Sequence, residues 1–222
     1  MLEKKKINNI NNITKTLKKE YGTKPLTFLK GKKDYEFLFA VILSAQCTDK
    51  RVNEVTKDLY KKFKTLKSFS EADLKILEKE IKPCGFYKNK ARSLKNCAKK
   101  LISDYNSKVP SEMEDLISLP GVGRKTANVV RNTIFNIPSI AVDTHVKRVS
   151  KKLGLTNNTN PDKVEEDLMK YLPKSAWNIW NTHIISIGRE YCTARSPKCE
   201  ICPLSPYCAT YKIKKKKKEI CI

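Results

Sequence analysis

The chain has 222 residues, of which 40% are hydrophobic, and its formal net charge is +23, from 46 Lys and Arg against 23 Asp and Glu. This length allows one large or two small domains with a hydrophobic core. The chain contains no run of about 18 apolar residues, which excludes a membrane-spanning helix, and its basic N-terminus lacks the apolar stretch and cleavage site of a signal peptide. We therefore expect an intracellular protein that binds polyanions, although an AT-rich coding sequence would also raise the lysine content.

Apolar residues recur at the spacing of amphipathic helices through most of the chain, and no segment alternates convincingly as a strand does. Near the N-terminus, Ile10, Ile13 and Leu17 share one helix face, and Thr48 or Asp49 can cap a later helix. The sequence therefore predicts an all-α fold that ends in a mobile basic tail. The predicted helices span residues 7–21, 35–43, 49–63, 71–81, 88–105, 111–119, 125–135, 143–153, 161–171 and 176–190, and the tail spans residues 212–222.

A glycine turn between two predicted helices is the most informative feature, Leu119-Pro120-Gly121-Val122-Gly123-Arg124-Lys125-Thr126-Ala127. The helix before it starts with Ser111 and Glu114 in the arrangement of a capping box. Helix, Pro-Gly-x-Gly turn and helix make a helix-hairpin-helix, in which we expect the turn to take positive φ and the amides of Gly121 and Gly123 to point toward a phosphate. Such a hairpin holds a DNA backbone without reading its bases. The alternative is a plain helix–helix corner closed by a glycine.

Lys125 lies at the start of the helix after this turn, and Asp143 lies at the start of another helix. The helix dipole and the adjacent Arg124 both favour a neutral Lys125 amine, which beside a DNA phosphate can attack a sugar carbon. The alternative for Lys125 is an ordinary surface lysine. Asp143 can be its charge partner, an N-cap that accepts backbone amides, or both. His145 is either structural, which we favour, or a hydrogen-bond donor at the helix start.

Four of the eight cysteines lie close together with the spacing C-x6-C-x2-C-x5-C, namely Cys192, Cys199, Cys202 and Cys208. In an intracellular protein such a group indicates a metal site rather than disulfides. The spacing by itself leaves a four-cysteine zinc site and a [4Fe–4S] cluster open. The prolines around these cysteines leave the loop no core of its own, so metal ligation would have to supply its order.

Together these motifs resemble the endonuclease III family of DNA glycosylase/lyases, over roughly residues 20–211 in unbroken order. Two further segments carry the resemblance, Leu43-Ser44-Ala45-Gln46-Cys47-Thr48-Asp49 and Gly85-Phe86-Tyr87-x-x-Lys90-Ala91. The resemblance implies that Lys125 is the nucleophile and Asp143 its catalytic partner. It also implies that Gln46 fills the gap left by an extruded nucleotide and that Phe86 wedges into the duplex. For the four cysteines it favours a [4Fe–4S] cluster over zinc.

The function that the resemblance implies is a bifunctional glycosylase and abasic-site lyase of base excision repair that removes oxidised pyrimidines. Lys125 would attack C1′ of an extruded nucleotide, a Schiff base would form, and β-elimination would cut the strand 3′ to the abasic site. A hairpin lobe, residues 27–137, and a cluster lobe, residues 1–26 and 138–211, would have the DNA-binding cleft between them. The candidate DNA-contacting residues are Gln46, Phe86, Gly121, Gly123, Arg124, Thr126 and His145.

Two other functions stay open from the sequence. A monofunctional mismatch glycosylase has the same fold and cluster, but such enzymes lack a lysine at the position of Lys125. A non-catalytic DNA-binding scaffold would need neither Asp143 nor the segment around Gln46. We expect a monomer that binds damaged or abasic double-stranded DNA, in the cytoplasm of a prokaryote and associated with its nucleoid.

Overall fold

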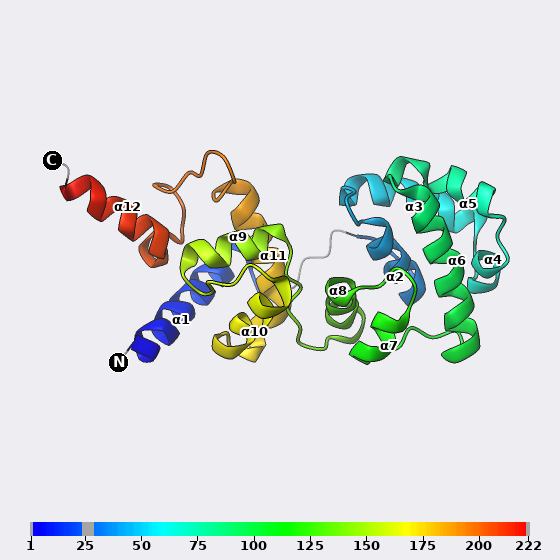
Figure 1. The fold of residues 1–222 in the computed structure, drawn as a ribbon, viewed down its shortest axis with the longest axis horizontal. Coiled ribbons are helices and arrows are strands. Elements are labelled where there is room, and N and C mark those ends of the chain that lie inside the picture. The colour runs from blue at the N-terminus through cyan, green and yellow to red at the C-terminus, as the bar shows by residue number, and fades with distance from the viewer. Residues whose placement is uncertain (1, 24–28, 221–222) are drawn as a thin grey trace. The chain divides into compact units, whose positions relative to one another are not determined.

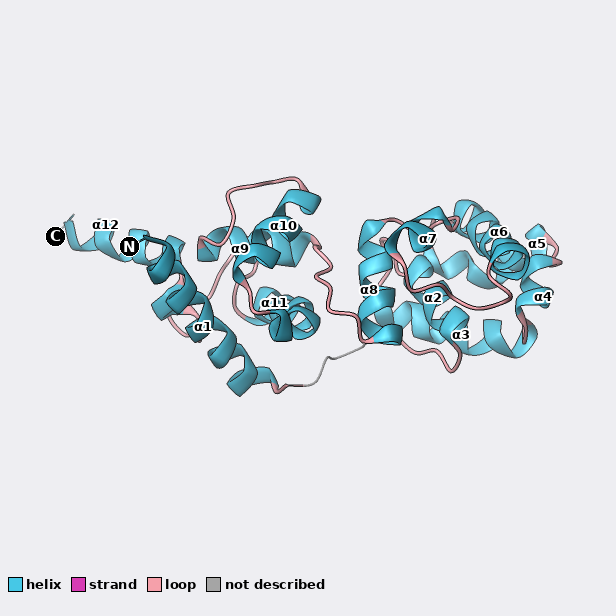
Figure 2. Ribbon diagram, turned by 90° about the horizontal axis from the view of Figure 1, so that it is seen from below, coloured by secondary structure: helices cyan, strands magenta, loops and turns pink. Residues whose placement is uncertain are grey.

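The computed structural model describes residues 2–23 and 29–220, and these residues form helices and loops without a strand (Figure 1, Figure 2). The all-α class predicted from the sequence is confirmed. The chain divides into two compact units, which we call the hairpin unit, Thr27–Ile137, and the cysteine unit, Met1–Leu26 with Pro138–Ile222. None of the described helices is long and apolar enough to cross a membrane.

The hairpin unit is built around α2 (Asp34–Leu43), whose residues from Tyr35 to Leu43 are all buried. The other elements of this unit are α3 (Asp49–Lys62), α4 (Leu66–Ser70), α5 (Leu74–Ile81), the 3₁₀ turn η1 (Lys82–Cys84), α6 (Tyr87–Asp104), α7 (Met113–Ser118) and α8 (Arg124–Phe135). Helices α3, α6 and α8 pack against α2 (Figure 1). A helix enclosed in this way needs apolar residues on every face, which explains why the sequence of α2 is apolar throughout rather than amphipathic.

Two helix starts in the hairpin unit differ from the sequence prediction. The helix expected over residues 71–81 begins later, as α5, because the Asp73 carboxylate caps it by accepting hydrogen bonds from two first-turn amides at 2.7 and 3.2 Å. The capping box expected from Ser111 and Glu114 was wrong. The N-cap of α7 is Glu112, no side chain caps this helix, and the Ser111 hydroxyl donates to the Glu112 carboxylate at 3.1 Å instead.

The cysteine unit is centred on α9 (Thr144–Leu153) and α11 (Trp177–Glu190), which pack against each other (Figure 1). Its other elements are α1 (Leu2–Tyr21), α10 (Pro161–Tyr171), the 3₁₀ turns η2 (Lys174–Ala176) and η3 (Ser205–Tyr207), and α12 (Ala209–Ile220). Helix α1 packs on α11 and η3 and buries Ile10, Ile13 and Leu17, so the apolar face predicted for this helix is confirmed.

The lysine-rich segment near the C-terminus is helical and belongs to α12, whereas the sequence led us to expect an irregular, mobile tail. Two physical reasons account for the helix. Lysine is a good helix former, and the start of α12 is fixed to α9, because the Thr210 hydroxyl donates to the carbonyl oxygen of Lys152 at 2.9 Å. The run of lysines therefore continues a helix whose first turn is anchored.

Candidate active site and metal centre

The glycine turn joins α7 to α8. Its first glycine, Gly121, is required both by its backbone conformation and by the close packing around it. Gly121 has φ of +84°, and a Cβ atom at this position would lie 2.8 Å from the Cβ atom of Ser93 on α6. Val122 is buried and its amide donates to the carbonyl oxygen of Leu119 at 3.1 Å, which closes the turn. The turn is therefore held rigidly against the hairpin unit.

The second glycine of the turn, unlike Gly121, does not have positive φ. Gly123 has φ of −100° and ψ of 176°, and an added Cβ atom would meet nothing within 4 Å. Gly123 is the N-cap of α8, and no side chain caps this helix. The first amides of a helix have no acceptor within it and carry partial positive charge. A glycine here leaves them open to an external anion such as a phosphate.

Lys125 lies in this uncapped first turn, as the second residue of α8, with its side chain exposed. Arg124 before it is also exposed, Thr126 after it is partly buried, and Ala127 is fully buried and attaches the helix to the core. The first turn of α8 therefore presents a primary amine and a guanidinium to solvent beside helix amides that can bind an anion.

Asp143 belongs to the cysteine unit, where it is the N-cap of α9. Its Oδ1 atom accepts a hydrogen bond from the amide of Val146 at 2.7 Å, so the N-cap role predicted for this residue is confirmed. His145 lies next to α11, with Nδ1 3.2 Å from the guanidinium of Arg148. A Cβ atom on Gly188 of α11 would come within 2.6 Å of that nitrogen. This close packing favours a structural role for His145.

Gln46 and Phe86 share two uncommon features. Both have left-handed backbones, with φ of 54° and 49°, and both have exposed side chains, Phe86 at 64%. Such a conformation costs a non-glycine residue on the order of 1–3 kcal/mol, and strain of this kind concentrates at functional sites. An exposed phenyl ring also gains no burial energy in the isolated protein. Both residues therefore combine a strained backbone with a solvent-exposed side chain, and both belong to the hairpin unit.

Two residues that sequence analysis did not assign a role, Lys90 and Arg148, hold the loops of the candidate sites. Lys90 is buried in the hairpin unit, and its ammonium group donates to three backbone carbonyl groups. The only signal for Lys90 in the sequence is its place in the Gly-Phe-Tyr-x-x-Lys-Ala segment. Arg148 binds the loop that carries the four cysteines, and nothing in the sequence distinguishes it from a surface arginine.

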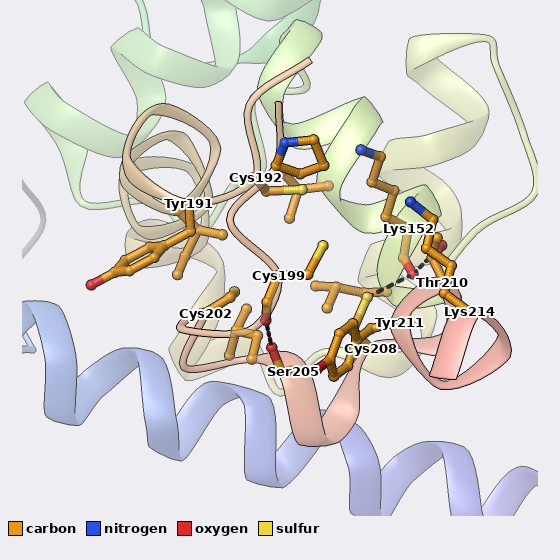
Figure 3. Close-up of a pocket in the computed structure, with 15 residues that line it drawn as sticks. Lys152, Tyr191, Cys192, Cys199, Cys202, Ser205, Cys208, Thr210, Tyr211 and Lys214 are labelled. Carbon is orange, nitrogen blue, oxygen red and sulfur yellow. Dashed lines mark hydrogen bonds between the residues drawn. The ribbon is translucent and has the colours of Figure 1, made fainter. Parts of the chain in front are cut away.

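The four clustered cysteines line one pocket in the cysteine unit, and Figure 3 shows their sulfur atoms around it. The remaining lining is apolar or hydroxylic except for two lysines, Lys152 and Lys214, and includes no carboxylate. Within the described ranges, no three His, Cys, Asp or Glu side chains converge closely enough to hold a single metal ion.

The loop that carries these cysteines is fixed to the helices beside it. The Cys208 thiol donates to the carbonyl oxygen of Lys152 at 3.3 Å, and the Ser205 hydroxyl donates to the carbonyl oxygen of Cys199 (Figure 3). Burial raises the pKa of the Cys192 and Cys202 thiols above the ordinary value, because a thiolate is poorly solvated there. A metal centre would supply the positive charge that these thiolates need.

Two parts of the chain match known protein families. Residues 39–174 match the HhH-GPD superfamily of base excision DNA repair proteins, and residues 192–208 match the iron-sulfur binding domain of endonuclease III. Endonuclease III of Bacillus subtilis (strain 168) is 46% identical to this chain over 175 residues, which are 78% of this chain and 80% of that protein.

Two solved structures have similar folds. One is a non-covalent endonuclease III–DNA complex, with a TM-score of 0.87 at 42% identity, covering 95% of this chain and 98% of that chain. The other is a trapped covalent endonuclease III–DNA intermediate, with a TM-score of 0.87 at 42% identity, covering 94% of this chain and 98% of that chain. Together with the two family matches, these similarities confirm the resemblance first found in the sequence motifs.

Proposed function

The chain belongs to the endonuclease III family, the DNA glycosylases and abasic-site lyases of base excision repair, and we propose that Lys125 is its covalent nucleophile. The observation that carries this proposal is the exposed Lys125 amine in the uncapped first turn of α8. A phosphate bound at the amides of that turn would hold a sugar next to the amine.

We propose that Asp143 is the catalytic partner of Lys125. Its cap of α9 engages Oδ1, so Oδ2 is the oxygen that can accept the amine proton or stabilise positive charge on the sugar. Asp143 can be both the N-cap of α9 and the catalytic partner of Lys125, because the cap also fixes the orientation of its carboxylate. The hydrogen bond to Val146 at 2.7 Å therefore supports catalysis by positioning the other oxygen.

The proposed reaction has four steps. The neutral amine of Lys125 forms a bond to C1′ while the bond from C1′ to the base breaks, and the base leaves with a proton. The sugar ring then opens as the C1′–O4′ bond breaks, which gives a Schiff base between C1′ and the lysine nitrogen. Loss of a proton from C2′ expels the 3′ phosphate, and water finally releases Lys125.

We propose Gln46 and Phe86 as the residues that hold the duplex open. A base inside a duplex cannot be reached until it leaves the stack, and something must then occupy the space and separate the neighbouring bases. An exposed amide and an exposed phenyl ring, each on a strained backbone, are suited to these two roles. Oxidised pyrimidines are the proposed substrates, because a base that stacks poorly costs less to extrude.

The family match indicates an iron–sulfur cluster in the cysteine unit, and we propose the [4Fe–4S] type. Cys192, Cys199, Cys202 and Cys208 would hold it, since they line one pocket that contains no carboxylate. When bound, the cluster would cross-link a loop that has little core of its own. The proposed role of the cluster is therefore to order this loop, and no step of the reaction requires it.

Borohydride trapping on DNA with an abasic site tests the assignment of Lys125. Reduction of a Schiff base leaves a stable protein–DNA adduct, which we expect with the unaltered chain and not with Lys125→Gln. Lys79→Gln, an exposed lysine of α5 in the same unit, is the matched control and should form the adduct normally. No adduct with the unaltered chain would favour a monofunctional glycosylase or a DNA-binding scaffold, whereas an adduct with Lys125→Gln would reject this lysine as the nucleophile.

A further inference from the structure

A buried lysine links the two loops that carry Gln46 and Phe86. Lys90 lies on α6 with 6% of its surface exposed, and its Nζ atom donates hydrogen bonds to the carbonyl oxygens of Leu43, Ala45 and Cys84, each at 2.8 Å. An ammonium group has three donors and no acceptor, so all three donors are used. Each of these bonds is charge-assisted, a class stronger than bonds between neutral groups.

The three acceptors come from two loops that are distant in sequence. Leu43 is the last residue of α2, and Ala45 lies in the segment after it and directly precedes Gln46. Cys84 ends η1 and lies two residues before Phe86. The backbone of Lys90 takes part as well, since its amide donates to the carbonyl oxygen of Phe86 at 3.1 Å. One residue therefore holds the chain next to both left-handed positions.

Among the described residues, the ammonium group of Lys90 binds three carbonyl oxygens and forms no ion pair with a carboxylate. Burial lowers its pKa below the ordinary value, while the nearby Cys84 and Cys47 thiols act in the opposite direction. A buried charge without a carboxylate partner is costly, and simple packing in the core would be served better by an apolar side chain. A lysine here is accordingly best explained by a need for three donors at one point.

We propose that Lys90 is a positioning residue that fixes the Gln46 and Phe86 loops relative to each other, so that both side chains can enter DNA at the same lesion. The proposal rests on the roles proposed above for Gln46 and Phe86. Two strained exposed residues do not keep a mutual distance unless the surrounding structure determines it. The three hydrogen bonds of Lys90 provide that constraint from behind the loops, without contact with DNA.

The same helix offers a matched control. Lys95 of α6 also donates from Nζ to a backbone carbonyl oxygen, that of Ala72, at 2.7 Å. The Ala72 carbonyl precedes α5 and is not part of either loop. Replacing Lys95 with Met removes a lysine–carbonyl bond from the same helix while leaving the loops of Gln46 and Phe86 fixed.

The test is a double-mutant cycle on duplex DNA that contains a tetrahydrofuran abasic-site analogue beside 2-aminopurine. This DNA lacks the reactive C1′ oxygen, so binding does not depend on the chemistry of Lys125, and the fluorescence of 2-aminopurine rises when the base is unstacked. We expect Lys90→Met to weaken binding about tenfold and to reduce the fluorescence rise. Lys95→Met should leave both unchanged. In a chain that already carries Gln46→Ala and Phe86→Ala, adding Lys90→Met should have no further effect.

Trapping of single-stranded abasic DNA separates this proposal from the assignment of Lys125, because no duplex has to be opened. The Lys90→Met protein should still form that adduct. The positioning role is overturned if Lys90→Met binds the duplex normally, or if its effect multiplies with that of the double alanine variant. It is also overturned, together with the roles of Gln46 and Phe86, if the double alanine variant binds normally. Failure of the unaltered chain to form the adduct would reject the assignment of Lys125 and leave the positioning role of Lys90 untouched. Failure of Lys90→Met alone would contradict a role limited to positioning the two loops.

Thermal unfolding of each variant shows whether a loss of binding is a loss of fold. If Lys90→Met does not fold at the assay temperature, Lys90→Gln takes its place in the same cycle. Its amide can donate to two of the three carbonyl groups, so it leaves fewer buried acceptors unsatisfied. The expected and the contradicting outcomes for Lys90→Gln are those given for Lys90→Met.

Discussion

The guanidinium of Arg148 binds the carbonyl oxygen of Cys192 through two nitrogen atoms, Nε at 3.2 Å and Nη2 at 3.0 Å. Nη2 also donates to the carbonyl oxygen of Gly188 at 3.1 Å. Cys192 is the first of the four clustered cysteines, and Gly188 lies in the last turn of α11. Arg148 on α9 therefore fixes the point at which the chain leaves α11 and enters the cysteine loop.

Arg148→Met should loosen the cysteine loop and destabilise the cysteine unit. The substitution leaves two carbonyl groups without their charged donor, at a cost of about 2–3 kcal/mol. We expect a lower unfolding temperature and faster loss of visible absorption when the protein is exposed to an iron chelator. Lys151→Met, an exposed residue of the same helix, should change neither measurement. Unchanged cluster lability in Arg148→Met would show that the loop does not depend on this contact.

Replacing a cysteine of the loop should remove the cluster and the order of the loop with it. A [4Fe–4S] centre predicts a brown protein with iron and acid-labile sulfide, whereas a zinc site is colourless. Cys202→Ala should lose the colour and become sensitive to proteases between Cys192 and Cys208. Cys97→Ala, which removes a fully buried thiol from the hairpin unit, should keep its iron. A colourless unaltered protein that contains zinc would overturn the assignment of the cluster.

The sequence was sufficient to predict the structure wherever a local pattern of residues determines it. The bounds of α10, the buried face of α1 and the cap of α9 by Asp143 follow from residue spacing and capping chemistry alone. The pattern was misleading at Ser111, because the same residues can form a capping box or another hydrogen bond, and tertiary contacts decide between them. Lys90 could not be interpreted at all, since its role depends on carbonyl groups 47, 45 and 6 residues away in the chain.

The two glycines of the hairpin should respond differently to alanine. Gly121→Ala forces an L residue into φ of +84° and places its Cβ atom 2.8 Å from the Cβ atom of Ser93, so we expect a loss of about 1–3 kcal/mol in stability. Gly123→Ala meets no atom within 4 Å and needs no unusual φ, so its stability should stay within about 0.5 kcal/mol.

DNA binding should nevertheless fall in Gly123→Ala, because its methyl group would occupy the space beside the first amides of α8. Urea unfolding and duplex binding of the two variants, measured side by side, check both statements. An equal loss of stability in the two variants, or normal DNA binding by Gly123→Ala, would contradict the interpretation that one glycine serves the fold and the other an external phosphate.

The pH dependence of stability should reveal His183, which is buried between α1 and α11. Burial lowers its pKa below the ordinary value of about 6.5, the Tyr21 ring lies 5.7 Å away, and no hydrogen bond to Nε2 is found among the described residues. The unfolded chain therefore takes up a proton at higher pH than the folded chain does. His183 costs the fold nothing above about pH 7, and stability falls as the pH decreases below about 6.5, by at most about 1.4 kcal/mol per pH unit.

His183→Gln removes this titration, and His145 is the only other histidine in the chain. Urea unfolding at pH 7.5 and at pH 5.5 should show a larger decrease in stability for the unaltered protein than for the variant. Both proteins retain the same carboxylates and the same cluster. The comparison therefore cancels the contribution of these groups to the pH dependence of stability. A variant that loses as much stability as the unaltered protein would show that His183 takes up its proton equally in the folded and the unfolded chain, so that burial does not lower its pKa.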